Sequence, residues 1–100
     1  MTANTRQTVG KIRIGVVDYN LIDTDVPDDI KGCHVSEIDL MSSSISLQAG
    51  LPREQRELAI IHESIHAINW KLDEATVEFL TQAFYQYIKQ NKVFIKEILK

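Results

Sequence analysis

Residues 57–68 read ELAIIHESIHAI, and this stretch decides the fold that we predict for the second half of the chain. Its apolar residues recur every three or four positions, which is the spacing that gives a helix one apolar face. We therefore predict a helix from about Pro52 to Trp70, with this face packed on a core. The predicted core residues of the helix are Leu58, Ile61, Ile65 and Ile68.

The same helix carries the pattern H-E-x-x-H between His62 and His66. These histidines lie one helical turn apart beside the apolar stripe, so both imidazoles can reach one metal ion at roughly 2.0–2.1 Å. Glu63 can then take a proton from a metal-bound water as general base. Alternatively, the two histidines are ordinary surface residues of an amphipathic helix. The helical context favours a metal site, with Zn2+ as the expected ion among several divalent ions that such ligands accept.

A second helix is predicted from Asp73, a favourable N-cap residue, to about Gln90. Only two residues separate the two helices, so they should pack as an antiparallel hairpin. Asn91 is expected to end the second helix and to begin a short third one. The predicted core stripe of the second helix is Val77, Leu80, Phe84 and Ile88.

Glu74 and Glu78 are the candidates for the third protein ligand that a catalytic zinc site needs. They lie one turn apart on the flank of the second helix, and a hairpin can bring both against the histidines. If one binds the metal, the other could accept the second ring N–H of a histidine. Alternatively, both are solvated acids that complement the helix dipole.

Two further side chains are candidates for the site. Tyr85 lies two turns after Glu78 on the same flank, where it could donate to a tetrahedral oxyanion or simply pack at the edge of the core. His34 is an alternative ligand from the first half of the chain, although a lone histidine is usually structural or exposed.

The first half of the chain has the alternating pattern of β-strands. Residues 9–21 alternate between apolar and polar positions with a bulge or bend near 15–17, and an acidic loop follows at 23–32. Residues 35–41 and 45–48 predict a hairpin around the serines at 42–44. We therefore expect an α+β fold, with a small, mainly antiparallel sheet packed on the helical hairpin. If 45–48 is a sheet edge, an extended peptide could pair with it; the alternative is an interior strand.

Composition limits the classes of function. The net charge of −3 and the lack of a basic stripe argue against nucleic acid as a partner, and no apolar run suggests a membrane span. Residues 1–8 are expected to be a disordered lead-in, and 9–100 a single domain. The polar Met1–Gly10 segment is unlike a secretory signal, and the lone Cys33 favours a reducing compartment, so we expect a cytoplasmic protein.

The pattern of both helices resembles the zincin superfamily, and within it the small metallopeptidase domains of the ImmA/IrrE type. It resembles still more closely short phage- and prophage-encoded proteins with an H-E-x-x-H domain of about this length. The resemblance covers roughly residues 35–99. Its residues are the run Ile60–Ala67, then Asp73, Glu74, Val77, Glu78, Leu80, Phe84, Tyr85 and Asn91.

This resemblance implies a minimal zincin-like fold in which His62, His66 and Glu74 bind zinc and Glu78 supports a histidine. It implies a zinc metallopeptidase of phage or prophage origin that acts on a peptide or protein in the bacterial cytoplasm, with Glu63 as general base. The connection between the second histidine and the third ligand is shorter than in many zincins. The alternative is a non-catalytic protein on a zincin scaffold that binds a host or phage protein, with the metal structural or absent.

Overall fold

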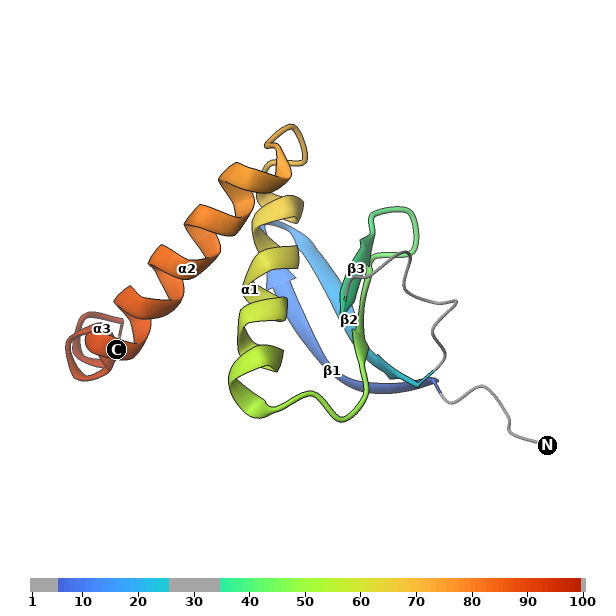
Figure 1. The fold of residues 1–100 in the computed structure, drawn as a ribbon, viewed down its shortest axis with the longest axis horizontal. Helices are drawn as coiled ribbons and strands as arrows, with labels where there is room; N and C mark the ends of the chain where they lie inside the picture. Colours follow the sequence, from blue (N-terminus) through green and yellow to red (C-terminus); the bar gives the residue numbers. More distant parts are fainter. Residues whose placement is uncertain (1–5, 26–34, 100) are drawn as a thin grey trace.

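A four-stranded sheet packed against the first of three helices forms the body of the protein (Figure 1). The computed structural model describes residues 6–25 and 35–99. In chain order the elements are β1 (Arg6–Ile14), β2 (Val17–Thr24), β3 (Ser36–Asp39), β4 (Ser44–Gln48), α1 (Arg53–Ile68), α2 (Glu74–Gln90) and α3 (Lys92–Ile98). The predicted α+β class is therefore confirmed. None of the helices in the described residues is long and apolar enough to cross a membrane.

The strand predicted for residues 9–21 is in fact a hairpin of two strands. Gly15 adopts a positive φ of 63°, which glycine tolerates and a tight turn needs, so the chain reverses there instead of bending. The change of phase in the alternation came from this turn. β1 begins at Arg6, where it pairs with Thr24 of β2, so residues 6–8, which we expected in the lead-in, belong to the sheet.

The sheet has the strand order β1-β2-β4-β3, with antiparallel pairs at both sides and one parallel pair, β2 with β4, in the middle. The predicted hairpin around 42–44 is present as β3 and β4. However, β4 has a neighbour on each side, so 45–48 is the interior strand that we gave as the alternative to a sheet edge, and it offers no edge to a peptide. Its side chains are buried accordingly: Ile45 and Leu47 are 0% exposed, and the strand lies at the centre of the core.

The core lies between the sheet and α1. Tyr19, Ile45 and Leu47 of the sheet form one buried cluster with Ala59 of α1. An ion pair of 2.7 Å between Arg56 and Asp23 also joins the helix to β2. The body therefore fixes α1, and with it the face that carries the histidines.

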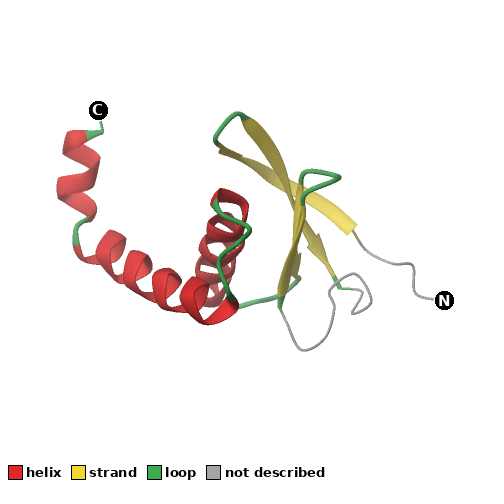
Figure 2. Ribbon diagram, turned by 90° about the horizontal axis from the view of Figure 1, so that it is seen from above, coloured by secondary structure: helices red, strands yellow, loops and turns green. Residues whose placement is uncertain are grey.

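The second helix packs on α1 through a face that is rotated from the one we predicted and that shares Val77 with it. Its buried residues are Val77, Thr81 and Tyr85, whereas Phe84 and Ile88 of the predicted core stripe are exposed. Glu74, Glu78 and Lys89 make polar contacts with α1, and these contacts set the rotation of α2. All three residues lie beside the apolar stripe of α2 and not within it. From the hairpin turn, α2 and then α3 extend away from the sheet, as Figures 1 and 2 show.

Candidate metal centre

Three side chains converge at the turn between α1 and α2. His62 and His66 come from α1, and Glu74 is the first residue of α2. Asp73 fixes the start of α2, because its Oδ1 accepts a hydrogen bond of 3.0 Å from the backbone N–H of Thr76. The possible ligand atoms of the two histidines and Glu74 all lie within 4.8 Å of one another. We call these three residues the ligand cluster.

The spacing of the ligand cluster fits a zinc ion. His62 Nε2 lies 3.3 Å from Glu74 Oε1, and His66 Nε2 contacts the same oxygen. Two ligands of a tetrahedral zinc ion at about 2.0–2.1 Å are themselves roughly 3.3 Å apart. The two imidazole rings are 4.9 Å apart at an interplanar angle of 64°, so their edges can converge on one point. Two nitrogens and one oxygen are a donor set that zinc uses when a fourth position is left for water or substrate.

Glu78 lies against the other nitrogen of the first histidine. Its Oε2 is 3.2 Å from His62 Nδ1, while His62 Nε2 faces Glu74. A metal-binding histidine usually donates its second ring N–H to such an acceptor, which fixes its tautomer and its orientation. The geometry thus distinguishes the two carboxylates: Glu74 lies where a ligand would, and Glu78 where a supporting acceptor would.

The charge of Glu74 suits metal binding. Burial opposes ionisation of its carboxyl group, but the hydrogen bond to His66 and the charges of both histidines outweigh burial and lower its pKa from the ordinary 4.5. The group is therefore a carboxylate at neutral pH, which is the form that binds a metal. Its side chain is 60% exposed, so the cluster is open to solvent.

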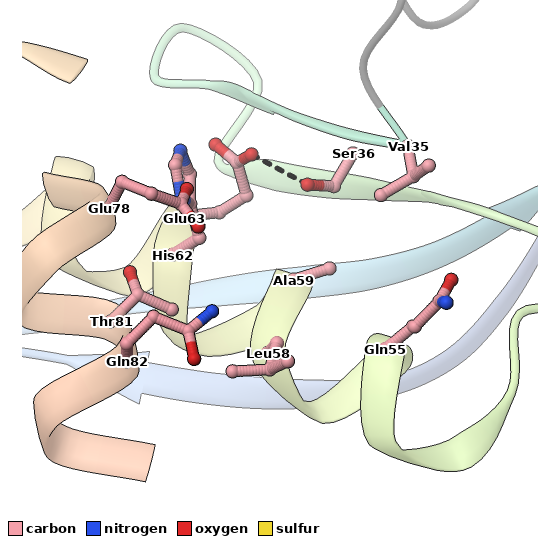
Figure 3. A pocket seen from close by; sticks show the side chains of 10 residues that line it. All are labelled: Val35, Ser36, Gln55, Leu58, Ala59, His62, Glu63, Glu78, Thr81 and Gln82. Carbon is pink, nitrogen blue, oxygen red and sulfur yellow. Dashed lines mark hydrogen bonds and ion pairs between the residues drawn. The ribbon is translucent and has the colours of Figure 1, made fainter. Parts of the chain in front are cut away.

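Glu63, the expected general base, is held by a residue that sequence reasoning did not select. Its side chain is only 6% exposed, and Ser36 Oγ of β3 donates a hydrogen bond of 2.7 Å to Glu63 Oε2. Figure 3 shows this bond between α1 and the first residue of β3. A serine at the start of a strand belongs to no motif, so only the fold reveals its role. The bond occupies one carboxylate oxygen and leaves Oε1 to accept a proton.

Two open cavities meet at this carboxylate, and Ser36, His62 and Glu63 line both of them. The first has a volume of about 340 Å³ and lies between α1, α2 and β3 (Figure 3). The second has a volume of about 350 Å³ and includes the ligand cluster. The first is further lined by Gln55, Leu58, Thr81 and Gln82, and the second by Ile38, Leu40 and Trp70.

Tyr85 does not join the ligand cluster. Its hydroxyl donates a hydrogen bond of 2.8 Å to Glu57 Oε1, near the start of α1. Seven positions along α2 separate it from Glu78, which corresponds to about 10 Å. Of the two roles that we considered for Tyr85, packing at the edge of the core fits this position, because the flank that it shares with Glu78 faces α1 two turns further along the hairpin.

Tyr85 instead belongs to a distal cluster with Glu57 and Lys89. Lys89 Nζ lies 3.3 Å from the same Glu57 oxygen. The hydrogen bond from Tyr85, with the nearby Lys89, lowers the pKa of Glu57 below 4.5. Burial and the contact with Glu57 raise the pKa of Tyr85. The Glu57 carboxylate accepts hydrogen bonds from both Tyr85 and Lys89, so the polar groups of the distal cluster are paired with one another. The distal cluster therefore joins the two helices and does not resemble a site for a ligand.

His34 and Cys33 lie outside the described residues. Comparison of the chain with protein-family models, with curated proteins and with solved structures gives no match. The geometry of the ligand cluster and the H-E-x-x-H pattern are therefore the observations that bear on function.

Proposed function

We propose that this chain is a zinc-dependent metallopeptidase-like protein that hydrolyses a peptide bond. The observation that carries the proposal is the convergence of two imidazole Nε2 atoms and the Glu74 carboxylate beside the buried Glu63. The resemblance to phage and prophage H-E-x-x-H proteins extends the proposal to a phage-encoded protein that acts in the bacterial cytoplasm. The two cavities that meet at Glu63 support a peptide or protein as the substrate.

In this proposal, His62, His66 and Glu74 hold the ion, and Glu78 orients His62. When bound, zinc would polarise the peptide carbonyl and make a neighbouring water more acidic. Glu63 accepts the proton as the water oxygen attacks the carbonyl carbon. It then gives that proton to the nitrogen of the leaving amine as the C–N bond breaks. Ser36 holds the Glu63 carboxylate in place through both steps.

The test is the substitution Glu63→Gln, with zinc content and peptide cleavage measured on the same preparation. We expect zinc to remain near one ion per chain and cleavage of a quenched-fluorescence peptide library to fall by about 10²–10⁴-fold, because the base is lost. Glu54→Gln, an exposed change on the same helix, is the matched control and should retain full activity. Cleavage by Glu63→Gln at the wild-type rate would remove this mechanism.

A second candidate is a non-catalytic protein that uses the same scaffold to bind a host or phage protein. The exposed apolar residues along α2 and α3 favour it, because such surfaces mark sites of association. Elemental analysis and the peptide library separate the two: zinc with cleavage supports the peptidase, whereas a folded protein without zinc and without cleavage supports the scaffold.

A further inference from the structure

The second and third helices carry an apolar surface that the fold of the single chain does not cover. The spacing of three and four positions that we predicted as a core stripe continues along α2 and through Asn91 into α3. Its exposed side, which we call the arm surface, consists of Phe84, Tyr87, Phe94 and Ile98. On α2 they lie roughly 90° around the helix from the row that packs on α1.

The side chains of the arm surface are largely exposed to solvent, although the apolar pattern of the sequence predicts a core along this face. Phe84 is 49% exposed, Tyr87 52%, and Phe94 and Ile98 both 58%. The polar contacts of α2 to α1 explain this, since Glu74 and Glu78 meet the histidines and Lys89 meets Glu57. The helix therefore turns its charged flank towards α1, so that Val77 stays buried while Phe84 and Ile88 of the same stripe are exposed.

The third helix gives an independent reason to expect a partner. It has only seven residues, none of them is buried, and Asn91 makes no side-chain capping bond to it. Helices much shorter than about 12–15 residues are marginal in water unless they pack against something. Within the described chain, packing does not bury α3, so a second surface is needed to hold it.

We propose that a second copy of this chain covers the arm surface, in a dimer with two-fold symmetry. With the neighbouring Ile88 and Leu99, the exposed apolar area is on the order of 600 Å² per copy, given the roughly 150–250 Å² of an aromatic side chain. A stable interface buries about 800 Å² per partner, so this surface is close to the size that a dimer needs.

The charges of α2 also fit a second copy. The helix has three charged residues, Glu74, Glu78 and Lys89, and all three contact α1. Two-fold symmetry places a surface against itself, so any charge near the axis would face its own copy. An uncharged apolar face avoids that repulsion. The ligand cluster lies on the α1 side of α2 and stays open to solvent in such a dimer.

The experiment is sedimentation velocity on the full chain over a range of concentrations, with Phe84→Glu and the matched control Gln86→Glu. Gln86 is exposed on the same helix but lies outside the arm surface. We expect wild type and Gln86→Glu to sediment as dimers, with twice the 11.4 kDa molecular mass of the chain. Phe84→Glu should weaken the dimer on the order of 100-fold or more, because each copy brings one charge to the interface.

Circular dichroism and hydrogen exchange keep the result interpretable. Phe84→Glu should retain the helical spectrum of the monomer, and Tyr87→Glu serves as a second variant if it does not. In the wild type, the amides of residues 92–98 should become more protected as the concentration rises, and in Phe84→Glu they should not. A wild-type chain that stays monomeric into the hundreds of micromolar would overturn the proposal and leave the surface to another protein. So would a dimer that Phe84→Glu and Tyr87→Glu leave intact, because that dimer would use another face.

Discussion

The two ends of the α1–α2 interface contain similar residues but differ in what those residues do. At the distal end, the carboxylate of Glu57 meets the hydroxyl of Tyr85 and the ammonium of Lys89. At the turn end, Glu74 and Glu78 meet the imidazoles of the two histidines. Donors and acceptors balance one another in the distal cluster. In the ligand cluster, two ring nitrogens and a carboxylate lie around one position, and we propose that a cation completes the arrangement. The comparison separates a contact that holds the hairpin together from one that can hold a metal.

The largest expected effect comes from Glu74→Gln, which should reduce zinc from near one ion per chain to a trace, since a neutral amide replaces an anionic ligand. Glu78→Gln should keep the metal with an affinity about 10–100-fold weaker, as expected for a residue that only orients a histidine. Competition with a chelator of known affinity measures both. Glu57→Gln is the matched control from the distal cluster and should leave zinc affinity unchanged. An equal loss of zinc affinity in all three variants would contradict the distinction between the ligand cluster and the distal cluster.

Ser36→Ala should have a smaller effect, on activity and not on zinc. Without the donated hydrogen bond the buried Glu63 carboxylate loses a positioning contact, so we expect kcat to fall about 10-fold with little change in KM. Ser36→Thr keeps a hydroxyl and should restore part of the rate. A kcat for Ser36→Ala that matches wild type, or a loss that Ser36→Thr does not restore, would show that Ser36 is only structural.

The smallest effect should come from Tyr85→Phe, which removes the hydroxyl donor of the distal cluster. The thermal midpoint should fall by a few degrees while zinc content and activity per bound zinc stay the same. The stabilisation depends on pH in a defined direction. The pKa of Glu57 is lowered by folding, so its contribution is present above 4.5 and is lost as the pH falls through the lower folded value.

Thermal unfolding followed from pH 7 down to pH 3 should therefore show the wild type and Tyr85→Phe converging at acidic pH. A difference between them that grows as the pH falls would contradict this assignment of the distal cluster.

The sequence predicted those features that depend on neighbouring residues. The spacing of His62 and His66 places both imidazoles on one face of any helix, and Asp73 marks the start of the next. Because the connection is so short, Glu74 and Glu78 had to come near the histidines. These local constraints were enough to identify the ligand cluster and the α+β class.

The features that the sequence did not predict depend on contacts between distant segments. The parallel pairing of β2 with β4 puts β4 inside the sheet, and no local pattern distinguishes an interior strand from an edge. The rotation of α2 was missed because periodicity finds the most apolar face, whereas polar contacts with α1 decide which face is buried. Ser36 was missed for the same reason, since its partner is Glu63, 27 positions away.

The central claim is most directly tested by X-ray absorption spectroscopy of the chain after purification with zinc. We predict one zinc per chain, bound by two imidazole nitrogens and a carboxylate oxygen at about 2.0–2.2 Å, with the imidazole signal reduced in His62→Ala and in His66→Ala. A folded protein that binds no zinc, or a bound zinc whose spectrum lacks imidazole, would contradict the account.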